Sequence, residues 1–271
     1  MIPKIIHICW LSGDPFLPEI LDCLDSWCKY LADYELYFWG KIPLNFTNFC
    51  RSFKSVKVCN FDLSSKIWTH EAFEAKKYAF AADYIRLYAV YHYGGIYLDS
   101  DVIIYKSFNP LLSLPYFIGQ DHEGGFEPAI FGAEKGCPWI KSILSHYDNR
   151  HFLLSDGEFD TNPLPRIFYN ILVPRYNMIR TIGNKAYDDV NKNFYIFSKD
   201  YFNSRDSMEV SPTHNSFCAH NYAGSWIKKD NSIKGLIIRV LPKKIVKLYF
   251  MISHNLWNKS KYRLNINNNI K

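Results

Sequence analysis

The sequence predicts an α/β fold built around a mainly parallel sheet. Short apolar runs that are typical of buried strands alternate with longer segments of helical periodicity. The chain has 271 residues, of which 48% are hydrophobic and 17% aromatic, so a disordered, collagen-like or low-complexity protein is excluded. A chain of this length can bury a substantial core, as one large domain or two small ones.

Strands and helices alternate along the first part of the chain. The apolar run KIIHICW predicts a buried strand at residues 4–10, and a helix that ends near Ala32 follows it. Apolar and aromatic runs predict two further strands, at residues 34–39 and 55–61.

The segment 71–93 contains neither Gly nor Pro and predicts the clearest helix of the chain. Its apolar residues fall on several faces, so we expect the helix to be well buried. Gly94 and Gly95 terminate it. The run IYLDSDVIIY then predicts a strand at 96–105 that is interrupted at its centre.

The remaining expected elements are shorter. They are strands at 116–121 and 128–134 and helices at 138–148 and 163–174. In folds of this class ligands bind at the carboxyl ends of the strands, so polar residues at those ends are candidates for a site.

Two carboxylates, Asp99 and Asp101, lie in the interrupted strand. Residues i and i+2 of a strand point to the same face, which would set these two carboxylates side by side. Like charges so close raise each other's pKa unless a cation joins them, and oxygen ligands suit Mg²⁺ or Mn²⁺. The apolar runs on both sides disfavour the alternative, a surface turn with two solvated aspartates.

A charged pair precedes this segment. Asp83 and Arg86 are three residues apart in the expected helix and therefore share a face. In so apolar a helix, each charge needs a partner or a ligand. Because the helix leads through Gly94-Gly95 directly into Asp99 and Asp101, one pocket can receive all four side chains; a purely structural ion pair is the alternative.

Membrane spans, leader sequences and disulfides are not expected. No run reaches the roughly 18 apolar residues that a span requires, and the N-terminus lacks the features of a signal peptide. The seven cysteines include no Cys-x-x-Cys pair, so we expect reduced thiols. These features favour a cytoplasmic protein.

The charge divides the chain at residue 227. Residues 1–227 carry 21 basic and 25 acidic residues, whereas residues 228–271 carry 11 basic residues and one acid. The second segment predicts a basic amphipathic helical tail. Two interpretations stay open: residues 228–263 bind an anionic membrane surface, or the helix packs on the body with a solvated basic face. The body is acidic and has no nucleic-acid motif, so nucleic acid is not an expected partner.

Three motifs in the same order resemble one known family. DYIRLYAVYHYGGIYLDSDV (83–102) resembles the DXD-containing sugar transferases of glycosyltransferase family 32. The start, IPKIIHICW, is similar to that family's I-P-K-I-I-H-x-x-W, and HNYAGSW (220–226) is similar to its closing H-x-x-x-x-S-W. The resemblance covers nearly all of residues 1–227. It implies a GT-A-type domain there, a nucleotide-sugar donor, a divalent cation and retention of anomeric configuration.

The resemblance also implies roles for five residues in donor binding. Trp10 would stack on the donor base and Tyr97 would line the nucleotide site. Asp83 and Arg86 would hold the donor sugar and its phosphate side. Asp99 would contact the ribose or the sugar.

A second set of residues is implied for the metal and the leaving group. Asp101 would bind Mn²⁺ or Mg²⁺ directly, with Asp99 beside it. Ser225 or His220 would complete the metal shell, and that choice stays open. Trp226 would touch the diphosphate. The candidate catalytic residues are therefore Asp83, Arg86, Asp99 and Asp101.

The middle of the chain is similar to the family's central region at 119–140. There Asp121, His122 and Glu123 are candidate acceptor contacts, or simply a polar loop. Relatives often carry Thr-Gly-Pro near the acceptor, whereas this chain has Thr-Asn-Pro at 161–163, so no acceptor role is assigned to it.

We therefore expect a retaining glycosyltransferase that moves a hexose, from a UDP-sugar by preference, to a glycan or lipid-linked acceptor. The context would be surface polysaccharide (capsule) or glycolipid synthesis, with the basic tail docked on the inner face of the plasma membrane. Two alternatives remain. One is a metal-dependent hydrolase of a phosphate ester or glycoside, with His92 or His220 as general base. The other is a non-catalytic nucleotide- or glycan-binding module.

Overall fold

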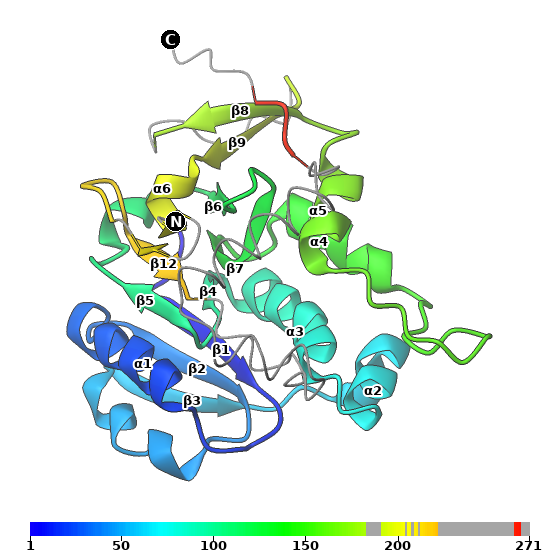
Figure 1. Cartoon of the computed structure of the whole chain (residues 1–271), viewed down its shortest axis with the longest axis horizontal. Helices are drawn as coiled ribbons and strands as arrows, with labels where there is room; N and C mark the ends of the chain where they lie inside the picture. Colours follow the sequence, from blue (N-terminus) through cyan, green and yellow to red (C-terminus); the bar gives the residue numbers. More distant parts are fainter. Residues whose placement is uncertain (183–190, 204, 207–208, 211, 222–262, 267–271) are drawn as a thin grey trace, which may run out of the picture.

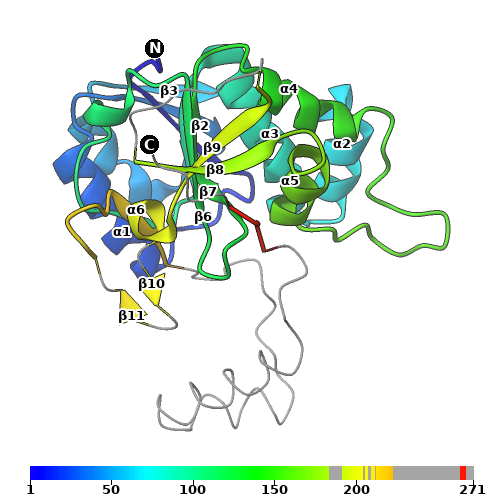
Figure 2. The ribbon, with the colours of Figure 1, turned by 90° about the horizontal axis from the view of Figure 1, so that it is seen from above.

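The centre of the molecule is an eight-stranded sheet with helices on both faces (Figures 1 and 2). The structure is a computed structural model. It describes residues 1–182, 191–203, 205–206, 209–210, 212–221 and 263–266.

Seven of the eight strands of this sheet run in one direction. The strand order is β3-β2-β1-β4-β7-β6-β9-β8, and only β7 pairs antiparallel with its neighbours. The strands are β1 (Ile5–Trp10), β2 (Glu35–Gly40), β3 (Ser55–Cys59), β4 (Gly95–Leu98), β6 (Tyr116–Gln120), β7 (Phe126–Ala133), β8 (Asn177–Thr181) and β9 (Asn193–Phe197). The carboxyl ends of the seven parallel strands therefore lie along one edge, and the predicted α/β class with a mainly parallel sheet is confirmed.

The helices cover the two faces unequally. They are α1 (Pro18–Tyr30), α2 (Ile67–Glu74), α3 (Tyr78–Tyr93), α4 (Pro138–Leu144), α5 (Leu164–Leu172) and the short α6 (Lys199–Phe202). Helix α1 lies on one face, and α3, α4 and α5 lie on the other (Figure 2). Short 3₁₀ turns occur at Leu44–Phe46, Phe49–Ser52, Leu63–Ser65, Asn109–Leu111 and Ser145–Tyr147.

Two pairs of short strands lie outside the central sheet. Strand β5 (Val102–Ile104) pairs antiparallel with β12 (Cys218–His220), and β10 (Arg205–Asp206) pairs with β11 (Glu209–Val210). Helix α1 packs on β5, where the Trp27 indole donates a 2.6 Å hydrogen bond to the carbonyl of Val102. This contact holds the segment after β4 against the body.

The core is divided by the sheet. Side chains alternate along β4, so Ile96 and Leu98 pack on the α1 side while Tyr97 packs on the α3 side. Strand β4 begins with a glycine that lies close to β1. A Cβ at Gly95 would lie 2.7 Å from the carbonyl oxygen of Ile5, so no larger residue fits there. Its φ of +106° also disfavours any side chain.

The helix expected at 71–93 is in fact two helices, so that prediction was wrong in its continuity. Lys76 adopts φ +56° after α2. The amide of Lys77 then donates to the carbonyl of Ala72, and that of Lys76 donates to Phe73, which is the Schellman arrangement that ends a helix. A lysine in the position that usually holds glycine leaves no signal in the sequence pattern.

All seven cysteines are free thiols. Burial raises the pKa of the Cys9 and Cys137 thiols to about 12, which makes them packing groups rather than nucleophiles.

The predicted basic tail lies mostly outside the described residues. Of the segment 228–263, only Arg263 is described. No helix in the described part of the chain is long and apolar enough to span a bilayer.

Candidate active site

The segment Asp99-Ser100-Asp101 is a turn, not the middle of one strand. Strand β4 ends at Leu98, and the chain re-enters a different sheet at Val102. The amide of Val102 donates to the Asp99 carbonyl at 3.1 Å, which closes the turn. The shared-strand argument for Asp99 and Asp101 was therefore wrong, although both carboxylates still lie at the carboxyl edge of the sheet. The turn is half-buried rather than solvated.

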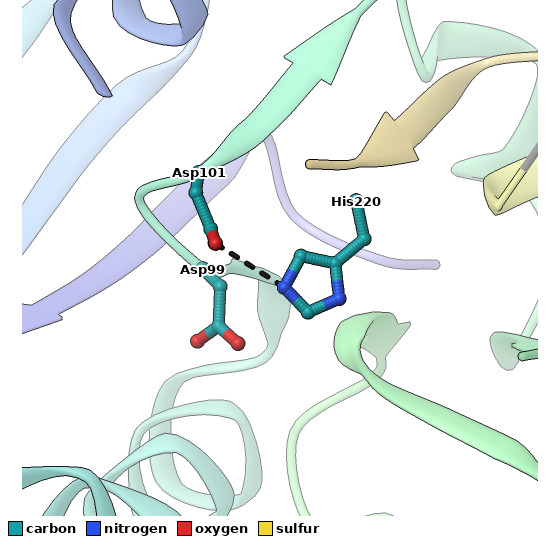
Figure 3. Close-up of side chains that lie close together, drawn as sticks. All are labelled: Asp99, Asp101 and His220. Atoms are coloured by element: carbon teal, nitrogen blue, oxygen red, sulfur yellow. Dashed lines mark ion pairs between the residues drawn. The ribbon is translucent and has the colours of Figure 1, made fainter. Parts of the chain in front are cut away.

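His220 lies beside this turn although it is about 120 residues further along the sequence. Strand β12 pairs with β5 so that His220 lies opposite Val102. Its Nε2 is 3.3 Å from Oδ1 of Asp101, and both side chains are 14% exposed. Figure 3 shows the side chains of Asp101 and His220 pointing toward each other, with Asp99 next to them.

This group fits a divalent cation. One ligand atom from each of Asp99, Asp101 and His220 lies within 4.8 Å of the others. Two carboxylates and an imidazole are a donor set that suits a divalent transition metal such as Mn²⁺ better than Mg²⁺, which prefers oxygen ligands. The three residues therefore form the candidate metal centre.

Arg86 on α3 holds the other side of the turn. Its guanidinium lies 3.1 Å from Asp83 and 3.2 Å from Asp99, and it donates to the carbonyl of Pro128 at 3.2 Å. The guanidinium carbon also lies 4.7 Å above the ring of Tyr97. The Tyr97 hydroxyl donates to Asp99 at 2.6 Å. Asp83, Arg86, Tyr97 and Asp99 thus form one largely buried network beside the candidate metal centre; Asp83, Arg86 and Asp99 were expected to share a pocket, whereas the contact with Tyr97 was not expected.

The network is electrostatically costly. Burial raises the pKa of Asp83 to about 7, even though the Arg86 guanidinium opposes that shift. Burial also raises the pKa of Asp99, again against Arg86 and His220. Such a concentration of shifted carboxyl groups at one sheet edge is typical of functional sites.

Glu127 belongs to the site and was missed by the sequence analysis. It lies on β7 with 3% of its surface exposed. Its Oε2 accepts a 2.6 Å hydrogen bond from Asn203, and its Oε1 lies 3.4 Å from Nδ1 of His220. Burial lowers the pKa of His220, but Glu127 and Asp101 outweigh burial and raise it well above its ordinary value. The available signal was a single acid in the apolar run FEPAIF at 126–131.

The segment that contains Asp83, Arg86 and the Asp99–Asp101 turn is similar to a known protein family. Residues 18–118 match the family described as a glycosyltransferase sugar-binding region containing a DXD motif. This part of the chain is therefore similar to the DXD glycosyltransferases. The match contains Asp83, Arg86 and the turn of Asp99 and Asp101, which is the DXD itself.

Two yeast proteins are similar over a longer stretch. Inositol phosphoceramide mannosyltransferase 3 of Schizosaccharomyces pombe is 28% identical over 60% of this chain and 43% of its own length. Mannosyl phosphorylinositol ceramide synthase SUR1 of Saccharomyces cerevisiae is 28% identical over 73% of this chain and 51% of its own. The chain thus spans about half the length of these curated relatives.

Among solved structures, PaToxG glycosyltransferase is 22% identical over 64% of this chain and 68% of its own, with a TM-score of 0.45. The predicted GT-A-type fold class agrees with the mainly parallel sheet described above.

The remaining predicted donor residues occupy different settings. Tyr97 is buried beneath Arg86, as described. Trp10 is half-buried at the end of β1, where its indole donates to the carbonyl of Asp14 at 2.8 Å and its ring lies 4.6 Å from that of Phe16. Its stacking on a base stays a prediction. Ser225 and Trp226 lie outside the described residues.

The loop predicted to contact the acceptor is the turn between β6 and β7. Asp121 closes it by accepting hydrogen bonds from the amides of Glu123 and Gly125. Burial, and then the nearby Glu127, raise the pKa of Asp121 to about 6. Residues 161–163 precede α5, so the structure assigns them a place at a helix start rather than at the DXD turn.

Proposed function

We propose that this chain is a retaining glycosyltransferase that moves a hexose from a nucleotide sugar to an acceptor hydroxyl. The observation that carries the proposal is the cluster of Asp99, Asp101 and His220 at the carboxyl edge of the sheet, inside and beside the DXD family match. A hydrolase would need a positioned general base of its own, and the family match favours transfer.

The geometry supports a division of labour between the two aspartates. Both oxygens of Asp99 face Arg86, and Tyr97 donates to one of them. Asp99 is therefore held in place to contact the donor sugar or ribose. Asp101 and His220 would hold Mn²⁺ or Mg²⁺ directly, with Asp99 beside them as the third residue of the candidate metal centre. When bound, that cation would neutralise charge on the departing diphosphate.

Arg86 supports the reaction by fixing carboxylates. Its guanidinium is 7% exposed and already contacts Asp83, Asp99 and the Pro128 carbonyl. We assign it, with Asp83, to the sugar side of the donor. Preorganised charges of this kind lower a barrier because they need no rearrangement during the reaction.

The names of the two yeast relatives suggest a sugar and an acceptor for this chain. The yeast proteins are named for mannose and for inositol phosphoceramide. We therefore propose a mannose-type hexose as the transferred sugar and a lipid-linked acceptor with a polyol headgroup. The nucleotide is UDP in the sequence-based expectation, and the first experiment compares it directly with GDP.

The test is a thermal-shift panel of UDP, GDP, CMP and their sugars, each with Mn²⁺ and with a chelator. A ligand at about 100 times its Kd should stabilise the fold by roughly 2.7 kcal/mol. We expect a Mn²⁺-dependent shift with one nucleotide family. No shift with any donor would overturn the proposal.

Asp101→Asn tests the same site by activity. The variant should keep its melting temperature, because Asp101 is not packed in the core, but should lose the Mn²⁺-dependent shift and at least about a hundredfold in transfer rate. Asp156→Asn, on an exposed loop, is the matched control. Wild-type turnover in folded Asp101→Asn protein contradicts the assignment.

A further inference from the structure

A pocket lies along the same edge of the sheet as the DXD turn. It has a volume of about 900 Å³ and is bordered by the β6–β7 turn, the end of β8, the segment after β9 and residues 263–266. Because β4, β6, β8 and β9 run in the same direction, their carboxyl ends open onto one side of the molecule.

The pocket adjoins the candidate metal centre through β7. Gln120, at the end of β6, is paired in register with Phe126, and Glu127 is the next residue along β7. Glu127 in turn faces His220. A molecule in this pocket would therefore lie beside the site where we place the donor sugar, which is where an acceptor must bind.

Arg180 is the first group that indicates the chemistry of the ligand. It is the penultimate residue of β8 and lines the pocket. The side chain is half-buried, and its Nε is buried without a hydrogen-bond partner among the described residues. A buried cationic donor without a partner is unfavourable unless a ligand satisfies it.

Arg263 is the second such group, and its position is fixed by its neighbour. The amide of Leu264 donates to the carbonyl of Gly124 in the β6–β7 turn at 3.0 Å, and the Leu264 side chain is buried in the core. The Arg263 side chain runs beside Gly124, within 3.4 Å of the place a Cβ would occupy there. Figure 2 shows this segment, in red, beside the β6–β7 turn.

Three acids line the pocket, and each has a partner: Glu123 lies 3.8 Å from the imidazole of His122. Asp121 accepts two backbone hydrogen bonds within its own turn. Asp200 accepts hydrogen bonds from Ser198 and Asn215. Neither aspartate contacts Arg180 or Arg263, so among the described residues that line the pocket both guanidinium groups can face a ligand.

We infer that this pocket binds the acceptor and that the acceptor carries a phosphate group, held by Arg180 and Arg263. Guanidinium groups suit this task because their planar forks bind phosphate oxygens in pairs. The inference rests on the proposed glycosyltransferase function and adds the anionic nature of the acceptor. A phosphorylated polyol can come from a lipid headgroup or from a free phosphate ester.

The test is a binding titration without donor, in which calorimetry compares myo-inositol 1-phosphate with myo-inositol. We expect the phosphate ester to bind at least about tenfold more tightly to the wild type. Arg180→Gln and Arg263→Gln should each remove roughly a factor of ten, since hydrogen bonds between charged groups are the strong ones. Arg175→Gln, an exposed arginine outside the pocket, should change nothing.

A vesicle arm distinguishes the two sources of phosphate. Binding to phosphatidylcholine vesicles that contain phosphatidylinositol, but not to pure phosphatidylcholine, with loss in Arg180→Gln, identifies a lipid headgroup. Binding of the soluble ester alone, with the same loss, identifies a free phosphate ester. Both results support the inference.

Stability supplies a second readout. Arg180 is half-buried, and its buried Nε has no hydrogen-bond partner among the described residues, so Arg180→Gln should have a melting temperature equal to or above that of the wild type. A fall in melting temperature would indicate that Arg180 is structural and would overturn its assignment. Arg263 is exposed, so its variant carries the binding test independently of folding.

Failure of this inference is separable from failure of the proposed function. Equal affinity for inositol and its phosphate, with an intact Mn²⁺-dependent nucleotide shift, overturns the anionic acceptor and leaves the glycosyltransferase. Absence of any nucleotide shift in the wild type overturns the glycosyltransferase itself.

Discussion

At the scale of single residues, the site depends on how buried charges are matched. The guanidinium of Arg86 is 7% exposed and meets two carboxylates, a carbonyl and an aromatic ring. Burial nevertheless raises the pKa of Asp83 to about 7, so the cation does not fully offset the loss of water. The protein thus maintains a strained electrostatic arrangement at the edge of its sheet, where the proposed donor would complete it.

Glu127 provides the clearest test at this scale. It faces Nδ1 of His220 and is itself oriented by Asn203. A carboxylate behind a metal-binding histidine fixes the ring and raises its basicity. We predict that Glu127→Gln lowers Mn²⁺ affinity by roughly 10- to 100-fold, measured by calorimetry, while the chain stays folded.

The control for this prediction is Glu158→Gln, which changes an exposed acid outside the candidate metal centre. It should bind Mn²⁺ as the wild type does. Unchanged Mn²⁺ affinity in folded Glu127→Gln protein would show that Glu127 has only a packing role.

At the scale of elements, β1 is tied to its neighbours by a buried histidine. The Trp39 indole of β2 donates to Nδ1 of His7 at 3.1 Å, so Nδ1 must be unprotonated. Nε2 then carries the hydrogen and donates to the carbonyl of Gly94, the residue between α3 and β4, at 2.8 Å. The neutral imidazole therefore connects three parallel strands that lead to the site.

This arrangement predicts a dependence of stability on pH. Burial lowers the pKa of His7 to about 4, from 6.5 in the unfolded chain. Between those values the unfolded chain binds a proton that the folded chain does not, so stability falls as the pH falls through this window. The shift corresponds to about 3 kcal/mol, lost by pH 4.

Chemical denaturation of the wild type and His7→Gln at pH 7.5 and pH 4 checks this prediction. The variant should lose about 3 kcal/mol less than the wild type between the two pH values. His70→Gln, which changes an exposed histidine, should keep the wild-type dependence. Parallel pH profiles for the wild type and His7→Gln would contradict it.

At the scale of the whole molecule, residues 263–266 return to the body after a long interval of sequence. Leu264 is 6% exposed and belongs to the core cluster between α3, α5 and the sheet. We predict that Leu264→Ala lowers the free energy of unfolding by about 2–4 kcal/mol, measured by urea denaturation. Leu44→Ala, at a residue that is 89% exposed, should change it by less than about 0.5 kcal/mol. Equal effects of the two substitutions would show that residues 263–266 add nothing to the fold.

Much of the fold could be predicted from apolar runs and helix ends. The strands ending at Trp10 and Gly40, and α1, α4 and α5, occur close to their expected positions. Strands β8 and β9 were not predicted, since NMIRT and NFYIF are short and lack clear alternation. The break at Lys76 was not predicted either, because it depends on one backbone conformation that lysine rarely adopts.

The candidate site shows the same division. Its acidic residues follow from their spacing and from the helix that carries Asp83 and Arg86, so the sequence located them without a structure. The prediction that Asp99 and Asp101 share a strand was wrong, because β4 ends at Leu98 and the chain turns there.

The sequence by itself determined the α/β class, the DXD segment and the charged pair beside it, since each depends on residues near one another in the chain. The family resemblance had named His220 as one of two candidate metal ligands, and the pairing of β12 with β5 places it beside Asp101. Only the tertiary structure brought Glu127, Arg180 and Arg263 to the same sheet edge, because they come from segments that are far apart in the sequence.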